Sequence, residues 1–249
     1  MIQENNIAQM PEADASGFVK TLNSMGFMTN YMDEFSQEFV EFAAKSEGPV
    51  LDIGAAYGNI TLPALKLGAN VISNDIDSRH LEIIADQARA KGVAERLKLL
   101  PGAFPDDLAI KPESLDAAIA CRVFHFFNGS QIESGIKTVA SWLKPGGKFF
   151  LVAETPYVGG VKHFIPLYEE RIKEGARWPG YVEDFMAIDP VRGKDLPKSM
   201  HLLDETVLTR AFSDAGLIIE RAHKFGRPLF PENLKLDGRE SVGIVGRKK

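Results

Sequence analysis

The stretch VLDIGAAYGNIT, residues 50–61, decides the fold of this chain. It begins as an apolar run typical of a buried strand, which contains Asp52 two positions before Gly54. A loop of small residues follows, and apolar residues at helical spacing begin at Ile60. A second apolar run then ends in Asp75. This order of strand, glycine loop, helix, strand and acid predicts a nucleotide-type cofactor site in a doubly wound sheet.

The acid in the first strand indicates which kind of cofactor fits. A dinucleotide site uses the pattern G-x-G-x-x-G, whose glycines let the backbone approach a pyrophosphate. Here Ala56 and Asn59 occupy the second and third glycine positions. The carboxylate of Asp52 would also repel a pyrophosphate, whereas it suits a cofactor with an ammonium and a sulfonium group. The sequence therefore argues against NAD.

The same stretch resembles the first motif of the class I S-adenosylmethionine-dependent methyltransferases, an acid followed by three alternating glycines. Asp52–Gly58 matches it with Ala56 in the middle glycine position, which is a mild change if φ is negative there. Asp75 then matches the ribose-binding acid, residues 115–121 the fourth strand and residues 143–151 the turn into the fifth. The resemblance implies S-adenosylmethionine as the cofactor and methyl transfer as the reaction. Two alternatives stay open at this point: Asp75 as a helix N-cap, and the glycines as tight-turn residues only.

The resemblance also implies one α/β domain over residues 1–249. We expect a doubly wound, mostly parallel seven-stranded sheet with helices on both faces and an antiparallel last strand. The core should comprise residues 47–156 and 203–249, preceded by N-terminal helices in residues 14–46 that Gly26 separates. In the resembling enzymes such helices cover the cofactor, so Phe27, Met28 and Tyr31 either line the cleft or pack on the core.

Residues 157–202 exceed what a minimal methyltransferase needs. A structureless loop of this length is improbable in a compact domain, so we expect a partly helical segment. Its aromatic and long aliphatic side chains are typical of a concave apolar site. The segment is therefore predicted to be a mobile cap that builds the acceptor pocket, with a rigid structural insertion as the alternative.

Cofactor-binding residues are expected at the carboxyl ends of the strands, beside the point where the strand order reverses. The family usually places an acid or amide for the adenine after the third strand, but Ala103 stands there. Its backbone and the ring of Phe104 would take that role, with Asp106 or Asp107 as alternatives. The full expected set is Tyr31, Asp52, Gly54, Ala55, Ala56, Gly58, Asn59, Asp75, Ile76, Ala103, Phe104, Cys121 and Arg122.

Methyl transfer requires mainly orientation and exclusion of water, together with proton removal where the acceptor is protic. The candidates for a catalytic base or orienting group are His125, Tyr157 and His163, followed by Glu154 and Tyr168. A histidine among phenylalanines, as at position 125, is equally typical of a packing residue. The scattered histidines predict no metal site, and Cys121 has no neighbouring base that would make it a nucleophile.

Composition narrows the function further. Of the 249 residues, 45% are hydrophobic and 25% charged, as in soluble globular proteins. The net charge of −5 gives no basic footprint for nucleic acid. No apolar run reaches the length of a membrane span, the start of the chain lacks a secretory pattern, and the single cysteine excludes an intramolecular disulfide. We expect a cytoplasmic enzyme with a small-molecule acceptor. The alternatives are methylation of a protein or nucleic acid, and S-adenosylmethionine binding without catalysis.

Overall fold

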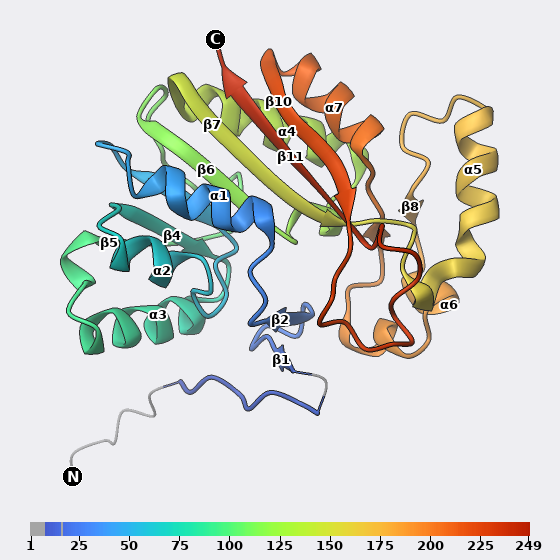
Figure 1. The fold of residues 1–249 in the computed structure, drawn as a ribbon, viewed down its shortest axis with the longest axis horizontal. Coiled ribbons are helices and arrows are strands. Elements are labelled where there is room, and N and C mark those ends of the chain that lie inside the picture. The colour runs from blue at the N-terminus through green and yellow to red at the C-terminus, as the bar shows by residue number, and fades with distance from the viewer. Residues whose placement is uncertain (1–7, 16) are drawn as a thin grey trace.

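The structure is a computed structural model of the chain, and it describes residues 8–15 and 17–249. A seven-stranded sheet forms its centre (Figure 1). In spatial order, the strands are β10 (Leu217–Phe225), β11 (Ser241–Lys248), β7 (Leu143–Glu154), β6 (Leu115–Cys121), β3 (Val50–Ile53), β4 (Val71–Asp75) and β5 (Leu97–Pro101). The strands from β7 to β5 pair in parallel, and β11 is antiparallel to both β7 and β10. The predicted sheet, including its antiparallel last strand, is confirmed.

Helices cover both faces of the sheet, as predicted. One face carries α1 (Glu34–Ala43), α2 (Thr61–Lys66) and α3 (Ser78–Ala90), and the other carries α4 (Gly129–Trp142) and α7 (Glu205–Asp214) (Figure 1). The alternation of side chains along β3 explains how one strand serves both faces. Val50 packs in the cluster under the first group of helices, whereas Leu51 and Ile53 pack in the cluster under α4 and α7. Asp52 therefore lies on the same face as Val50, toward α2.

The strand order places the site. The chain runs from β3 outward through β4 and β5, then returns to β6 on the other side of β3 and continues to β7. The order therefore reverses between β3 and β6. Loops at the carboxyl ends of these two strands diverge from each other, which leaves a crevice for a ligand.

The N-terminal region corrects one prediction. Only the second expected helix forms, as α1, which begins after Asp33 caps its N-terminus through a bond from the Ser36 amide. In place of the first helix, β1 (Phe18–Lys20) and β2 (Phe27–Thr29) form an antiparallel hairpin. Ser24 and Gly26 take φ values of 56° and 118°, which a right-handed helix does not allow.

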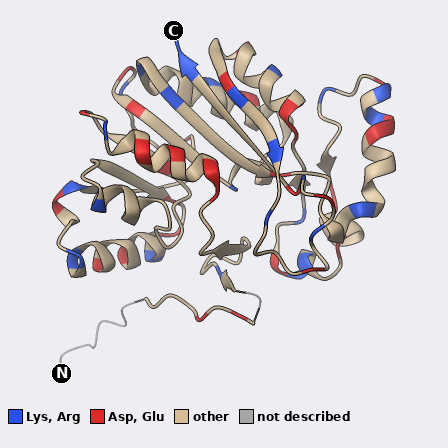
Figure 2. Ribbon diagram, in the orientation of Figure 1, with Lys and Arg blue, Asp and Glu red and all other residues tan. Residues whose placement is uncertain are grey.

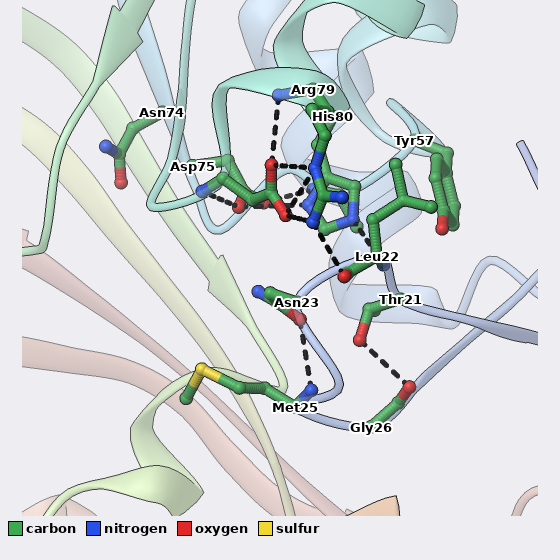
Figure 3. Close-up of polar contacts among 12 residues, drawn as sticks. Thr21, Leu22, Asn23, Met25, Gly26, Tyr57, Asn74, Asp75, Arg79 and His80 are labelled. Atoms are coloured by element: carbon green, nitrogen blue, oxygen red, sulfur yellow. Dashed lines mark hydrogen bonds and ion pairs between the residues drawn. The ribbon is translucent and has the colours of Figure 1, made fainter. Parts of the chain in front are cut away.

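Polar side chains in the hairpin turn give the physical reason. The Thr21 hydroxyl donates to the Gly26 carbonyl at 3.0 Å, and the Met25 amide donates to the side-chain oxygen of Asn23 at 3.1 Å (Figure 3). Such short-range bonds satisfy backbone groups that a helix would otherwise pair, and they compete with helix formation. The apolar residues that suggested a helix are partly buried in the hairpin: Phe18 and Leu22 pack against small apolar clusters, and Met25 lines a cavity described below.

Residues 157–202, which we call the insertion, are partly helical, as predicted. They contain the 3-10 segments η3 (Gly159–Phe164) and η4 (Arg192–Asp195), the helices α5 (Ile165–Lys173) and α6 (Phe185–Ile188), and the paired strands β8 (Tyr181–Val182) and β9 (Met200–His201). Two further 3-10 turns lie outside this segment: η1 (Ala94–Arg96) precedes β5, and η2 (Phe124–Phe126) follows β6. The apolar side chains of the insertion pack with Phe230 and Leu234, from the loop between β10 and β11, as a separate small core. Mobility of the insertion stays a prediction.

Figure 1 shows the hairpin, the segment around α6 and the loop between β10 and β11 at one end of the sheet, with α5 off to the side. Within residues 8–15 and 17–249, none of the helices has both the length and the apolar character that crossing a bilayer requires.

Candidate functional site

A cavity of about 620 Å³ lies at the carboxyl ends of the parallel strands. Its first half, as we name it, is lined by the loops after β3, β4 and β5. Its second half is lined by the end of β7, by η4 and by residues 226–240, the loop between β10 and β11. Residues 121–127, after β6, lie between the two halves, and the hairpin contributes Phe18 and residues 25–29. The volume is within the range of small-molecule sites.

The structure brings the predicted cofactor-binding residues together. All of them except Gly58 line this one cavity. Gly58 lies behind the wall at φ 82°, where an added Cβ would stand 3.0 Å from a side-chain carbon of Ile84 in α3. Its role is thus the close approach of the loop to α3. Phe27 and Met28, which were expected either to line the cleft or to pack on the core, also line the cavity.

The loop after β3 depends on two backbone conformations of positive φ. Gly54 has φ 67°, and a Cβ there would meet the side chain of Val123 at 2.5 Å, so a larger residue does not fit. Ala56 has φ 45°, so the negative φ under which alanine would be a mild change at this glycine position is not present. In this conformation the Ala56 amide donates to the Asp75 carboxylate at 2.9 Å, which offsets part of the cost of the left-handed backbone.

Asp52 is a buried carboxyl group, 2% exposed. The Thr61 hydroxyl donates to it at 2.7 Å and lies 2.6 Å from the Ser73 hydroxyl. Burial raises the pKa of Asp52 to about 6; the bond from Thr61 opposes this rise and the charge of Asp75 adds to it. An ionised carboxylate in such surroundings favours a cationic group nearby.

Asp75 is the centre of a hydrogen-bond network at the end of β4 (Figure 3). It accepts the Ala56 amide on one oxygen, and the Asp77 amide and His80 Nδ1 on the other, at 2.9–3.0 Å. The N-cap of α3 is Asp77, whose side chain accepts the Arg79 amide. The alternative that Asp75 caps this helix is therefore wrong. A carboxylate offers about four lone-pair sites, so Asp75 retains room for about one more donor.

His80 joins Asp75 to the N-terminal hairpin (Figure 3). The Leu22 amide donates to Nε2 of His80 at 2.9 Å, so this nitrogen carries no proton. The proton consequently resides on Nδ1, which donates to Asp75 at 3.0 Å. The His80 side chain is completely buried. The ring thus acts as a rigid link between the hairpin and the first half of the cavity.

The loop after β5 offers backbone and aromatic groups. Ala103 and Phe104 both line the cavity, and the Ala103 amide donates to the Asp107 carboxylate at 2.9 Å. The ring of Phe104 lies 6.0 Å from that of Phe127 in a stacked arrangement. Asp106 also lines the cavity, whereas Asp107 is engaged with the loop backbone.

Cys121 and Arg122 follow β6. Arg122 has φ 61° and lies near Asp33, with its Nη1 3.4 Å from the carboxylate and 3.0 Å from the Cys121 sulfur. Its Nε and Nη2 are buried and have no hydrogen-bond partner among the described residues. Burial raises the pKa of Cys121 to about 11, so the thiol stays protonated at neutral pH.

Of the three residues predicted first as catalytic, His125, Tyr157 and His163, His125 alone lines the cavity. The His125 side chain is buried against Phe126, with ring centroids 4.3 Å apart, and its Nδ1 has no partner within the described chain. Burial lowers the pKa of His125 to about 4, and nearby Glu154 only partly opposes this. The ring is therefore neutral at neutral pH and can accept a proton or a hydrogen bond.

Three other candidates lie outside the cavity wall. Tyr157 packs in the small core of the insertion, where the Arg239 guanidinium lies 3.7 Å from its ring centre. His163 is exposed on η3, and the Tyr168 hydroxyl donates to Asp204. The sequence did not reveal that these three residues lie outside the cavity. After Glu154 at the end of β7, the next residue along the chain that lines the cavity is Val191.

Sequence reasoning missed Arg192 and Arg227, which line the second half together with Glu154. Nη1 of Arg192 donates to both oxygens of Glu154 at 2.8 and 3.0 Å, and Arg227 lies 3.7 Å from the same carboxylate. Burial alone would raise the pKa of Glu154, but the two arginines outweigh it and hold the pKa below its usual range. Glu154 is thus a paired anion, which argues against its predicted role as a base.

The described part of the chain contains no set of side chains that could bind a metal ion. Across residues 8–15 and 17–249, no three side chains of His, Cys, Asp or Glu converge in a way that could hold an ion.

Comparison with known proteins finds similarity to methyltransferases in both sequence and structure. Residues 50–147 match a protein family described as a methyltransferase domain. A ubiquinone biosynthesis O-methyltransferase of Rhizobium etli is 28% identical over 102 residues, 41% of this chain and 39% of that enzyme. One of Rhizobium johnstonii matches to the same extent. The chain thus spans about two fifths of the length of these curated relatives.

Solved structures share the fold over most of the chain. A S-adenosylmethionine-dependent methyltransferase of Methanosarcina mazei has a TM-score of 0.60 and 21% identity, and covers 82% of this chain and 93% of its own. A geranyl diphosphate C-methyltransferase of Streptomyces coelicolor has a TM-score of 0.58 and 13% identity, over 85% of this chain and 79% of its own. At sequence identities of 21% and 13%, the similarity to these structures establishes the fold alone.

Proposed function

We propose, from the premise that this chain belongs to the class I S-adenosylmethionine-dependent methyltransferase family, that it transfers a methyl group from S-adenosylmethionine to a small-molecule acceptor. The observation that carries the proposal is the convergence of Asp52, the Gly54 loop and Asp75 at the point where the strand order reverses. Two buried acids and a tight glycine loop fit a cofactor that carries ribose hydroxyls and cationic groups.

The first half of the cavity would hold the cofactor. Asp75 would accept a ribose hydroxyl at its remaining lone-pair site, and the carboxylate of Asp52 would stabilise the cationic end of the cofactor. The ring of Phe104 and the backbone of Ala103 would contact the adenine. The unpaired guanidinium nitrogens of Arg122 suit the carboxylate of the cofactor's methionine part.

S-adenosylmethionine supplies a methyl group already activated by its sulfonium. What remains for the chain is to orient the acceptor, exclude water and remove a proton from a protic acceptor. The hairpin and the aromatic residues after β6 would enclose the reactants. We assign proton removal to His125, because its neutral ring lines the cavity and leaves Nδ1 without a partner.

The acceptor class rests on the size of the site and the distribution of charge. A cavity of about 620 Å³ that also holds the cofactor leaves room for a small acceptor. Figure 2 shows basic and acidic residues interspersed along α3 and α5 in place of a basic stripe, which disfavours nucleic acid. The Rhizobium relatives, which are named as O-methyltransferases of ubiquinone biosynthesis, support the same choice. A cytoplasmic location stays a prediction.

Calorimetry with adenosylhomocysteine and NAD, followed by turnover with isotope-labelled S-adenosylmethionine and a metabolite extract, tests the proposal. We expect adenosylhomocysteine to bind and NAD not to bind, and we expect labelled product above the protein-free blank. Binding without turnover would identify a non-catalytic binding protein. Preference for NAD, or no binding of either compound, would refute the proposal.

A further inference from the structure

The second half of the cavity contains a buried cation with too few partners. We propose that Arg227 binds a carboxylate group of the methyl acceptor. This inference rests on the proposed function, because it assigns the second half of the same cavity to the acceptor.

Arg227 is held in the loop between β10 and β11 and is 7% exposed at its side chain. Within the described residues its guanidinium makes no hydrogen bond, and its nearest carboxylate is Glu154 at 3.7 Å. The guanidinium lies 3.3 Å from the ring centre of Phe230, which fixes its plane. Burial and the nearby charge of Arg122 lower the pKa of Arg227 well below its usual range. A largely buried guanidinium that has one carboxylate at 3.7 Å and no hydrogen-bond acceptor favours an anionic ligand.

Glu154 does not supply that anion. Both of its oxygens already accept Nη1 of Arg192, at 2.8 and 3.0 Å. Arg192 is fixed from its other side by Asp189, whose carboxylate accepts Nε at 2.6 Å, and its Nη2 is left without a partner. One carboxylate therefore serves two guanidinium groups, and donors remain at this end of the cavity.

The position of Arg227 assigns it to the acceptor. Most of the predicted cofactor residues follow β3, β4 and β5, and Cys121 and Arg122 stand at the end of β6, whereas Arg227 and Glu154 lie at the β7 side of β6. Met200, Phe230 and Leu234 line the same half and would contact an apolar body. A guanidinium that is fixed on a ring binds carboxylates and phosphates as a planar fork.

Charge balance favours a carboxylate over a phosphate. The three cavity arginines, Arg122, Arg192 and Arg227, already have carboxyl groups beside them in Asp33, Asp189 and Glu154. Asp52 and Asp75 add two more acids in the first half, so the cavity accommodates one added negative charge more easily than two. A dianionic phosphate would leave an unbalanced negative charge in a buried site, which is unfavourable.

A transfer assay with chemically treated extracts tests this assignment. Isotope-labelled S-adenosylmethionine is incubated with the protein and a metabolite extract in three forms: untreated, with carboxyl groups converted to amides, or treated with alkaline phosphatase. The comparison uses the wild type, Arg227→Gln, Arg227→Lys and Arg239→Gln. Arg239 is the control because it lies in the same loop and pairs with Asp237 outside the cavity. Calorimetry with adenosylhomocysteine accompanies every variant.

We expect amidation to lower labelling by the wild type at least tenfold and phosphatase to leave it unchanged. Arg227→Gln should lower labelling at least tenfold with adenosylhomocysteine affinity within twofold of wild type, Arg227→Lys should restore part of it, and Arg239→Gln should match wild type. Labelling that survives amidation would refute the assignment of a carboxylate to the acceptor, while the proposal of methyl transfer would stand. A loss of adenosylhomocysteine affinity in Arg227→Gln would assign Arg227 to the cofactor instead. Absence of adenosylhomocysteine binding to the wild type would refute the proposed function itself.

Discussion

Individual residues of the cavity adopt states that ordinary folding rules disfavour. Ala56 and Arg122 occupy left-handed backbone conformations without being glycine. Asp52 and Arg227 keep charged groups in buried surroundings. Each state costs free energy, so the rest of the structure must hold it in place. Clusters of strained backbone conformations and buried charges are typical of functional sites. They lead to predictions about two single residues.

Replacing Asp75 by Ala should weaken adenosylhomocysteine binding by about 1.5–3 kcal/mol, the scale of a lost hydrogen bond to a charged group. The carboxylate has about one free acceptor site after the bonds from Ala56, Asp77 and His80, which is why one bond sets the magnitude. Calorimetry measures the change, with Asp237→Ala on the surface as the control. Unchanged affinity would show that Asp75 only organises the loop.

Asp52→Asn should have opposite effects on stability and binding. The folded pKa of Asp52, about 6, is above its usual 3.8, so the folded protein binds this proton more tightly than the unfolded chain does. The free energy of unfolding therefore decreases as pH rises from about 4 to about 6. The amide variant lacks that loss and should be more stable at pH 7 by about 1–3 kcal/mol, as measured by urea denaturation.

The same substitution should weaken cofactor binding, because it removes the charge that faces the cationic groups. In the wild type, affinity for S-adenosylmethionine should decrease as pH falls through about 6, and Asp52→Asn should abolish this dependence. Calorimetry at pH values roughly one unit below and one unit above this transition distinguishes the two proteins. Identical pH profiles would contradict a role of Asp52 in charge recognition.

At the scale of elements, the N-terminal hairpin is attached to the core through side chains of the core loops. The Tyr57 hydroxyl donates to the Lys20 carbonyl at 2.6 Å, and the Asn59 side chain donates to the Thr29 carbonyl at 3.1 Å. His80 adds the link from the Leu22 amide to Asp75. The hairpin therefore covers the cavity as an element tied by a few polar bonds and limited apolar packing.

His80→Phe should release this attachment while it preserves the ring volume. The variant loses both hydrogen bonds and leaves the Leu22 amide and the Asp75 carboxylate without those partners. We expect amide hydrogen exchange of residues 20–24 to accelerate at least tenfold, or about 1.4 kcal/mol of local stability, while the sheet strands keep their protection. His223→Phe, at a half-exposed site on β10, is the control. Unaltered exchange in the hairpin would show that Tyr57 and Asn59 suffice.

At the scale of the whole molecule, the sheet separates two large cores, and the insertion adds a third. Phe149 of β7 and Phe212 of α7 are fully buried in the first of these and stack with ring centroids 5.1 Å apart. Neither residue lines the cavity. Stability and ligand binding should therefore respond separately to changes in this core.

Phe212→Ala should lower the free energy of unfolding by about 3–5 kcal/mol, the cost of a large cavity in a packed core. Adenosylhomocysteine affinity of the folded fraction should stay within about twofold of wild type, equivalent to about 0.4 kcal/mol. Urea denaturation and calorimetry measure the two quantities. Ile218→Ala, on a partly exposed side chain of β10, should cost much less. A comparable loss at both positions would contradict the assignment of this core.

The sequence by itself determined the first half of the site. Residues 50–61 and Asp75 are close in the chain, and their strand, loop and helix are specified by local periodicity and by turn residues. The resemblance to a known family supplied the strand order, which periodicity does not contain. From these, Asp52, Gly54, Asp75 and their neighbours could be placed around one cavity before the structure was known.

Only the tertiary structure decided the second half. Glu154, Arg192 and Arg227 come from three distant segments, and nothing in their local sequence indicates that they meet. The hairpin was also missed, because turn bonds and its attachment to Tyr57 and His80 override the helical spacing of its apolar residues. Local patterns record which face of an element is apolar. Partners of a buried charge depend instead on how loops from separate parts of the chain pack together, and that is fixed by long-range contacts.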